Sequence, residues 1–164
     1  MSKSITIPFS QAGLERAADW LEDYVKSLKD KASELLNAML KEGEMTAKLY
    51  LEHIDTGQTL NSIMGYRNGN KGVIVVGGNA IWIEFGTGVV ANEGNAPHPK
   101  AAELNMSPWG TYGYGLGASP DGWYYKRADG QVRHTYGIPS NPFMYETAKM
   151  LRRQCPRMAR EVFK

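Results

Sequence analysis

The chain has 164 residues and a formal net charge of +2, with 42% hydrophobic and 22% charged residues. These values are typical of one globular domain with a real core, and the total charge is too small to indicate nucleic-acid binding by itself. The single cysteine, Cys155, excludes an internal disulfide and fits a reducing compartment. No stretch approaches 18 apolar residues and the start, MSKSITIPF, lacks a signal-peptide pattern, so we expect a protein of the cytoplasm or of a particle assembled there.

A long helix is predicted over residues 10–54, after an N-terminal arm at residues 1–9, with Ser10 as its N-cap. Its apolar residues step alternately by four and three, which is the spacing of a helix-packing seam: Leu14, Ala18, Leu21, Val25, Leu28, Ala32, Leu35 and Met39. Flanking apolar residues widen this stripe, so we expect the helix to pack on its own domain, with a leucine zipper as the alternative. Gly43 predicts a bend in the helix.

Two β-hairpins follow in the predicted order. Residues 62–85 hold the first hairpin, which turns at 68–72, and then the apolar run IWIEF, which is either a strand or one helical turn. Residues 122–136 hold the second hairpin. A final helix is predicted over residues 141–163, with Asn141 as N-cap, Pro142 at the first helical position and a kink at Pro156.

The stretch between the hairpins, residues 86–121, is a predicted long loop with seven glycines and four prolines. Its aromatic residues Trp109, Tyr112 and Tyr114 are compatible with base stacking, with an arm that orders against a partner, or with a plain surface loop. Lys100 is its only basic residue, which argues against nucleic acid because phosphate binding needs Lys and Arg.

The tripeptide Asp55-Thr56-Gly57 matches the catalytic signature of aspartic proteases. Those enzymes need two carboxylates that share a proton, so a single copy would have to complete its site in a dimer. Here the tripeptide follows the predicted end of the long helix, and Gln58 lies at capping-box spacing from Asp55. We therefore interpret it as a helix-to-helix corner, in which Asp55 or Thr56 caps and Gly57 makes the turn, and keep a dimeric protease as the alternative.

Other catalytic and metal-binding patterns are missing from the sequence. His53, His98 and His134 lie far apart without a ligand partner at metal spacing, and Cys155 is the only thiol. The glycine pairs lack the Lys-Ser or Lys-Thr of a phosphate loop, and there is no Gly-x-Ser-x-Gly elbow. We expect no metal, no cofactor and no enzymatic activity.

Three motifs occur in order along the chain. They are Asp55-Thr56-Gly57 followed by Leu60 and Ser62-Ile63, Glu84-Phe85-Gly86-Thr87-Gly88 preceded by Trp82, and Gly137, Pro139 and Pro142-Phe143-Met144 at the opening of the last helix. With this order over most of residues 14–155, the chain resembles the tail-completion and head–tail joining proteins of long-tailed bacteriophages, often labelled minor capsid or tail component.

This resemblance implies an α+β fold, in which a small antiparallel sheet made by the two hairpins is packed by the long N-terminal helix and the C-terminal helix. It implies a non-enzymatic virion protein of the phage neck, assembled in the host cytoplasm. The implied partners are further copies of the chain in a six-membered ring, the neighbouring head-connector and tail-tube or tail-terminator proteins, and the double-stranded DNA that passes through without sequence-specific contacts. The protein is expected to be a monomer before assembly and to have no membrane partner.

The second motif also has a physical interpretation of its own. Two glycines around Thr87 permit a chain reversal, while Trp82 and Phe85 can anchor in the core. The segment is therefore either a simple loop exit or part of an interface, whose candidate residues are Trp82, Glu84, Phe85, Gly86, Thr87, Gly88, Trp109, Tyr112 and Tyr114.

The last helix is strongly basic. Residues 149–164 carry six basic side chains against Glu161, and the candidate contact residues are Lys149, Arg152, Arg153, Arg157 and Arg160. This face is either solvated, with cations well placed near a helix C-terminus, or it contacts an acidic partner ring or passing DNA. Three functions therefore compete: a structural neck protein, a nucleic-acid-binding module that uses this helix and the aromatic loop, and a dimeric aspartic protease.

Overall fold

The structure is a computed structural model that describes residues 6–51, 57–88, 90, 98–104, 121–127 and 129–164. Its helices are α1 (Gln11–Leu51), α2 (Gln58–Ser62), α3 (Ala80–Phe85) and α4 (Phe143–Val162). Its strands are β1 (Met64–Asn68), β2 (Lys71–Val75), β3 (Thr87–Gly88), β4 (Trp123–Lys126), β5 (Val132–Thr135) and β6 (Gly137–Ile138). The mixture of helices and small antiparallel sheets confirms the predicted α+β class.

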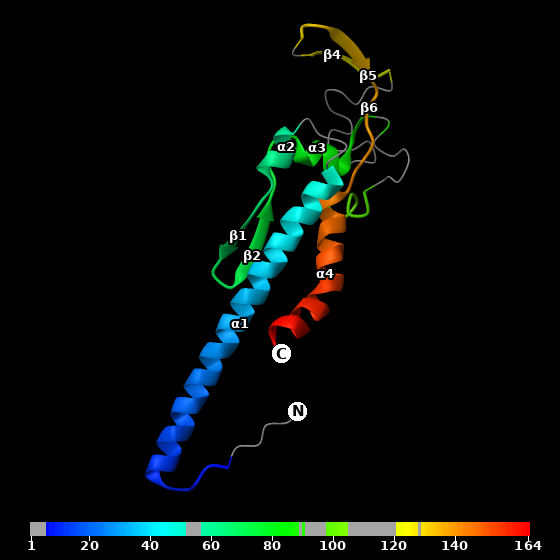
Figure 1. The fold of residues 1–164 in the computed structure, drawn as a ribbon. Helices are drawn as coiled ribbons and strands as arrows, with labels where there is room; N and C mark the ends of the chain where they lie inside the picture. Colours follow the sequence, from blue (N-terminus) through cyan, green and yellow to red (C-terminus); the bar gives the residue numbers. More distant parts are fainter. Residues whose placement is uncertain (1–5, 52–56, 89, 91–97, 105–120, 128) are drawn as a thin grey trace.

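Helix α1 runs from one end of the molecule to the level of α3, and strands β4, β5 and β6 lie beyond its C-terminal end (Figure 1). With 41 residues it is about 60 Å long at 1.5 Å per residue. Its predicted N-cap is confirmed, because Ser10 Oγ accepts a hydrogen bond of 3.2 Å from the Gly13 N–H. Helix α4 packs against its C-terminal half in the opposite direction, from Phe143 beside Leu51 to Lys164, whose carbonyl accepts a bond of 3.0 Å from Lys31 Nζ.

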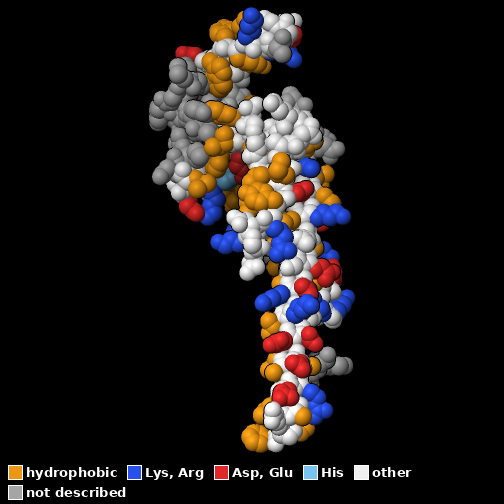
Figure 2. All heavy atoms as spheres, turned by 90° about the vertical axis from the view of Figure 1, so that its left-hand side faces the viewer, with side chains coloured by type: hydrophobic (Ala, Val, Ile, Leu, Met, Phe, Trp, Pro, Cys, Tyr) orange, Lys and Arg blue, Asp and Glu red, His pale blue; other side chains and the backbone are white. Residues whose placement is uncertain are grey.

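The expectation that α1 packs on its own domain along its whole stripe is wrong for the N-terminal half. Every residue from Ala18 to Asp30 is exposed. The reason is length, since α4 has 20 residues and at about 30 Å reaches along only half of α1. Figure 2 shows the uncovered half of α1 standing clear of the rest of the molecule.

Gly43 lies in the covered half, and α1 continues through it without interruption. A Cβ atom at this position would overlap the side chains of Ile74 in β2 and Leu151 in α4. Gly43 therefore lets both elements approach the helix closely, which is a packing role that the sequence pattern did not reveal.

The six strands form three separate two-stranded antiparallel sheets, and not the single small sheet that we expected. The first hairpin pairs Met64 with Val75 and Asn68 with Lys71, so its turn lies at the predicted place, and it packs against α1. The second hairpin pairs Trp123 with Thr135, also as predicted, and projects at the far end of the molecule (Figure 1). The pairing of β3 with β6 was not predicted.

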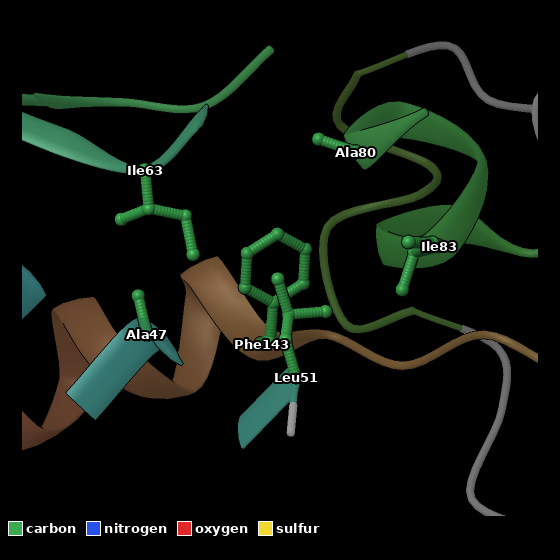
Figure 3. Close-up of a cluster of buried hydrophobic side chains, with 6 residues drawn as sticks. All are labelled: Ala47, Leu51, Ile63, Ala80, Ile83 and Phe143. Carbon is green, nitrogen blue, oxygen red and sulfur yellow. The ribbon is translucent and has the colours of Figure 1, made fainter. Parts of the chain in front are cut away.

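The core lies where the end of α1 meets α3 and the start of α4 (Figure 3). Its buried members are Ala47, Leu51, Ile63, Ala80, Ile83 and Phe143. The run IWIEF is thus helical, because α3 turns Ala80 and Ile83 toward this core. None of the described helices is both long and apolar enough to cross a membrane.

Helix α4 buries Phe143, Thr147 and Met158. The apolar residues Met144, Leu151, Cys155 and Val162 are half-buried beside them, and Ala148 is exposed. The helix continues through Pro156, and Figure 1 shows it changing direction in its last turns, as expected for a proline inside a helix.

Phe143 is 1% exposed and contacts elements from three parts of the chain, so its removal tests the core. We expect Phe143→Ala to lower the free energy of unfolding by about 3–5 kcal/mol, because it removes a large buried side chain and leaves a cavity. Urea denaturation measures this change. As a control, Tyr124→Ala, at a side chain that is 74% exposed, should change the free energy by no more than about 0.5 kcal/mol.

Candidate functional site

Glu84 is a buried carboxylate at the end of α3, with 8% of its surface exposed. Its Oε2 accepts a hydrogen bond of 2.8 Å from the Met144 N–H, and its Oε1 accepts one of 3.0 Å from the Tyr145 N–H. These are the second and third N–H groups of α4, which have no partner inside the helix. Glu84 therefore caps a helix that lies 60 residues further along the chain.

His98 completes this buried cluster. Its Nε2 lies 2.9 Å from Glu84 Oε1, and its Nδ1 accepts a hydrogen bond of 3.0 Å from the Lys100 N–H. Because Nδ1 is an acceptor, the ring proton is on Nε2, and the Nε2–H group donates a hydrogen bond to the Glu84 carboxylate. The ring lies between Phe85 and Tyr145, at centroid distances of 4.3 and 5.6 Å. Both nitrogens and both carboxylate oxygens are engaged within the chain, so the pair is arranged as a structural clamp.

The backbone around Glu84 is tied to the segment before α4. Ser140 Oγ donates to the Glu84 carbonyl at 2.7 Å, and the Asn141 N–H donates to the Ile83 carbonyl at 2.8 Å. A Cβ at Gly86, where φ is 72°, would come within 2.7 Å of the Ile138 carbonyl oxygen and the Ser140 nitrogen. The second and third sequence motifs are thus two sides of one buried junction, closed by the β3–β6 pair.

The predicted cap at Asn141 is wrong. The N-cap position of α4 is Pro142, which makes no side-chain cap, and the Asn141 side chain instead donates to the Tyr50 carbonyl at 3.3 Å. The capping acceptor comes from Glu84, because the chain before α4 is held against α3 and the local side chain points elsewhere.

The interface predicted around the second motif does not hold for its buried members. Glu84, Gly86 and Gly88 are buried in the single chain, and Trp82, Phe85 and Thr87 are half-buried. Trp109, Tyr112 and Tyr114 lie outside the described residues, as does most of the predicted loop 86–121. Among the described residues of that loop, His98 is buried, whereas Pro99 and residues 102–104 are exposed.

Of the Asp-Thr-Gly tripeptide, Asp55 and Thr56 lie outside the described residues, as does His53. Gly57 has φ of 92° and stands at the N-cap position of α2 without a side-chain cap, which supports its predicted turn role. Gln58 is therefore the first residue of α2 and not the third, so the capping-box spacing from Asp55 does not apply.

The basic residues of α4 share one exposed face, as predicted from helical spacing. Lys149 pairs with Glu146 and Arg157 with Glu161, each at 3.0 Å. The side chains of Arg152, Arg153 and Arg160 form no ion pair with any residue that the structure describes. Among the described residues of α4, these three arginines are therefore the basic side chains that can bind a negatively charged partner.

The second hairpin carries an exposed aromatic cluster that the sequence analysis missed. The His134 ring lies at 4.7 Å from the Tyr124 ring and 4.8 Å from the Tyr136 ring, and its Nε2 donates to the Asp121 carbonyl at 2.7 Å. Tyr124 and His134 are direct cross-strand partners, so their alternation along the strands was the available signal.

Within the described parts of the chain, no three His, Cys, Asp or Glu side chains are grouped so as to hold a metal ion. No protein-family model, curated protein or solved structure matches the chain.

Removal of the Glu84 carboxylate tests its capping role. We expect Glu84→Ala to destabilise the protein by about 1–3 kcal/mol or more, because it leaves the buried His98 N–H and the two part-buried N–H groups of α4 without their acceptor. Glu84→Gln, which keeps one acceptor oxygen, should fall between Ala and wild type in urea denaturation. Glu103→Ala, at an exposed glutamate, is the matched control; equal effects of Glu84→Ala and Glu103→Ala would contradict the capping role.

Proposed function

We propose that this protein is a structural component of the neck of a long-tailed bacteriophage, where it completes the tail or joins the tail to the head as a ring around the DNA channel. The observation that carries the proposal is the buried junction. The segments behind the family resemblance contribute Ile63, Ile83, Glu84, Phe143 and Met144, which lie in or against one core. In this chain the three segments therefore pack together, which supports treating them as one signature.

A non-enzymatic role fits the chemistry of the described residues. The one buried carboxylate–imidazole pair has all its polar atoms engaged, and its contacts hold α4 in place. The exposed surface offers features suited to contact: the uncovered half of α1, the three α4 arginines that form no ion pair with a described residue, and the aromatic hairpin. An assembly protein needs such contact surfaces and no reaction centre.

The basic face of α4 supports a partner with negative charge. Its exposed guanidinium groups bind carboxylates or phosphates, and phosphate contacts carry no base information. We propose that this face meets an acidic surface of a neighbouring neck protein or the backbone of passing DNA.

Deletion of the coding sequence from the phage genome tests the function directly. We expect DNA-filled heads and separate tails that fail to join, visible by electron microscopy of the lysate. Expression of the wild-type protein from a plasmid should restore infectious particles. Normal numbers of infectious particles from the deletion phage would contradict the proposal.

Charge reversal on α4 tests the basic face. We expect the triple variant Arg152→Glu, Arg153→Glu and Arg160→Glu to stay folded, by circular dichroism, because these side chains are exposed. It should fail to restore joining, because the attraction becomes repulsion. The control Lys41→Glu, Lys71→Glu and Lys126→Glu makes the same charge change at exposed sites elsewhere and should restore it. Full rescue by the α4 variant would show that this face is only solvated.

A further inference from the structure

The uncovered half of α1 presents a continuous apolar stripe. Leu14, Leu21 and Val25 are 53%, 53% and 46% exposed, and Leu28 is 38% exposed. Trp20 and Tyr24 extend the stripe sideways, with their rings stacked at 5.3 Å. A lone helix of this length is marginal in water, because most helical stability in proteins comes from packing of an apolar face. We therefore expect another apolar surface to pack against this stripe.

The spacing of the stripe points to another helix as its cover. Leucine stands at every seventh position, at Leu14, Leu21 and Leu28, and Ala18 and Val25 fill the intermediate seam positions. This alternation of four and three keeps one seam facing a helical partner. Within the chain the same seam continues to Met39, which lines an apolar pocket with Met144 and Leu151 of α4, so the seam already packs against a helix where one reaches it.

The charges along this half of α1 are divided by position. Residues 11–24 hold four acids against Arg16, a net charge of −3. Residues 25–32 hold three lysines against Asp30, a net charge of +2. A helix with this division is complementary to a second copy that runs in the opposite direction, whereas a parallel copy would place like charges together.

We infer that the uncovered half of α1 pairs antiparallel with the same segment of a second copy of this chain. In the pairing centred on Asp23, Leu21 meets Val25 of the second copy and Ala18 meets its Leu28, so small residues face large ones. Glu15, Glu22 and Lys29 each directly follow a seam leucine, so they flank the seam on one side. In this register Glu15 lies beside Lys29 of the second copy, twice by symmetry. Glu22 lies beside Glu22 of the second copy, which is the one like-charge pair. A register shifted toward the C-terminus of α1 would place Met39 in the seam between the two copies. Met39 is already used within the chain, because it lines a pocket with Met144 and Leu151 of α4.

Other occupants fit the stripe less well. The described part of the N-terminal arm, residues 6–8, lines a pocket with Gly13, Ala17 and Trp20 that ends at Leu21, and Val25 and Leu28 remain 46% and 38% exposed. A membrane surface is disfavoured because helices that lie on anionic lipid carry Lys and Arg beside the apolar face, and here the first half is acidic. The pairing goes beyond the proposed function and does not rest on it, since it concerns the purified chain alone.

Analytical ultracentrifugation of the full chain over a range of concentrations tests the pairing. We expect a reversible dimer, and at least a tenfold higher dissociation constant for Leu21→Glu with Val25→Glu. The control Ser27→Glu with Asn37→Glu adds the same two charges at exposed positions of α1 off the seam and should leave the dimer intact. A monomer at all concentrations, or equal effects of the two double variants, would overturn the inference. Urea denaturation confirms that the body of each variant is folded.

A charge swap tests the direction of pairing. Glu15→Lys alone and Lys29→Glu alone should each weaken the dimer at low salt, because each places like charges side by side. The double variant Glu15→Lys with Lys29→Glu should recover the wild-type dissociation constant. In a parallel pair these two positions do not meet, so a double variant as weak as the singles would exclude the antiparallel arrangement.

Discussion

Glu84 ends the short helix α3, yet its carboxylate supplies the acceptors that the first turn of α4 lacks. Burying an ionised carboxylate is costly unless donors compensate it. Here two backbone N–H groups, the positive end of the α4 dipole and the His98 N–H provide that compensation. Once α4 begins at this point, Phe143 falls between α1 and α3 and fills the core. The position of α4 along α1, and with it the packing of Gly43 against Leu151, follows from the same anchor.

Local patterns predicted the elements well. The Ser10 cap, both hairpins, the turn at Gly57 and the α+β class follow from short-range chemistry that is legible in sequence: capping side chains, Asn-Gly turns and apolar periodicity. The predicted helical seam was real as well. Periodicity does not reveal whether another element of the chain is long enough to cover the whole seam. Here α4 covers only half of α1.

The junction around Glu84 was not predictable by such means. Nothing near Asn141 indicates that its helix is capped from a distance, because the capping residue is set by the tertiary path of the chain. The β3–β6 pair is two residues long on each side and has no hydrophobic alternation to reveal it. Each of the three motifs nevertheless contributes a buried residue to the described structure, namely Ile63, Glu84 and Phe143. The exposed apolar, basic and aromatic surfaces lie on α1, α4 and the second hairpin.

The division of charge along α1 has a consequence for symmetry. A segment complementary to its own reversed copy makes a twofold contact, which is closed and leaves no surface for a third subunit to extend. A ring placed between a head and a tail must instead have two different faces, so its subunits contact one another head to tail and cannot be related by such a twofold axis. The twofold contact through α1 could therefore not link neighbouring subunits around the proposed ring, which would have to be built through other surfaces of the chain.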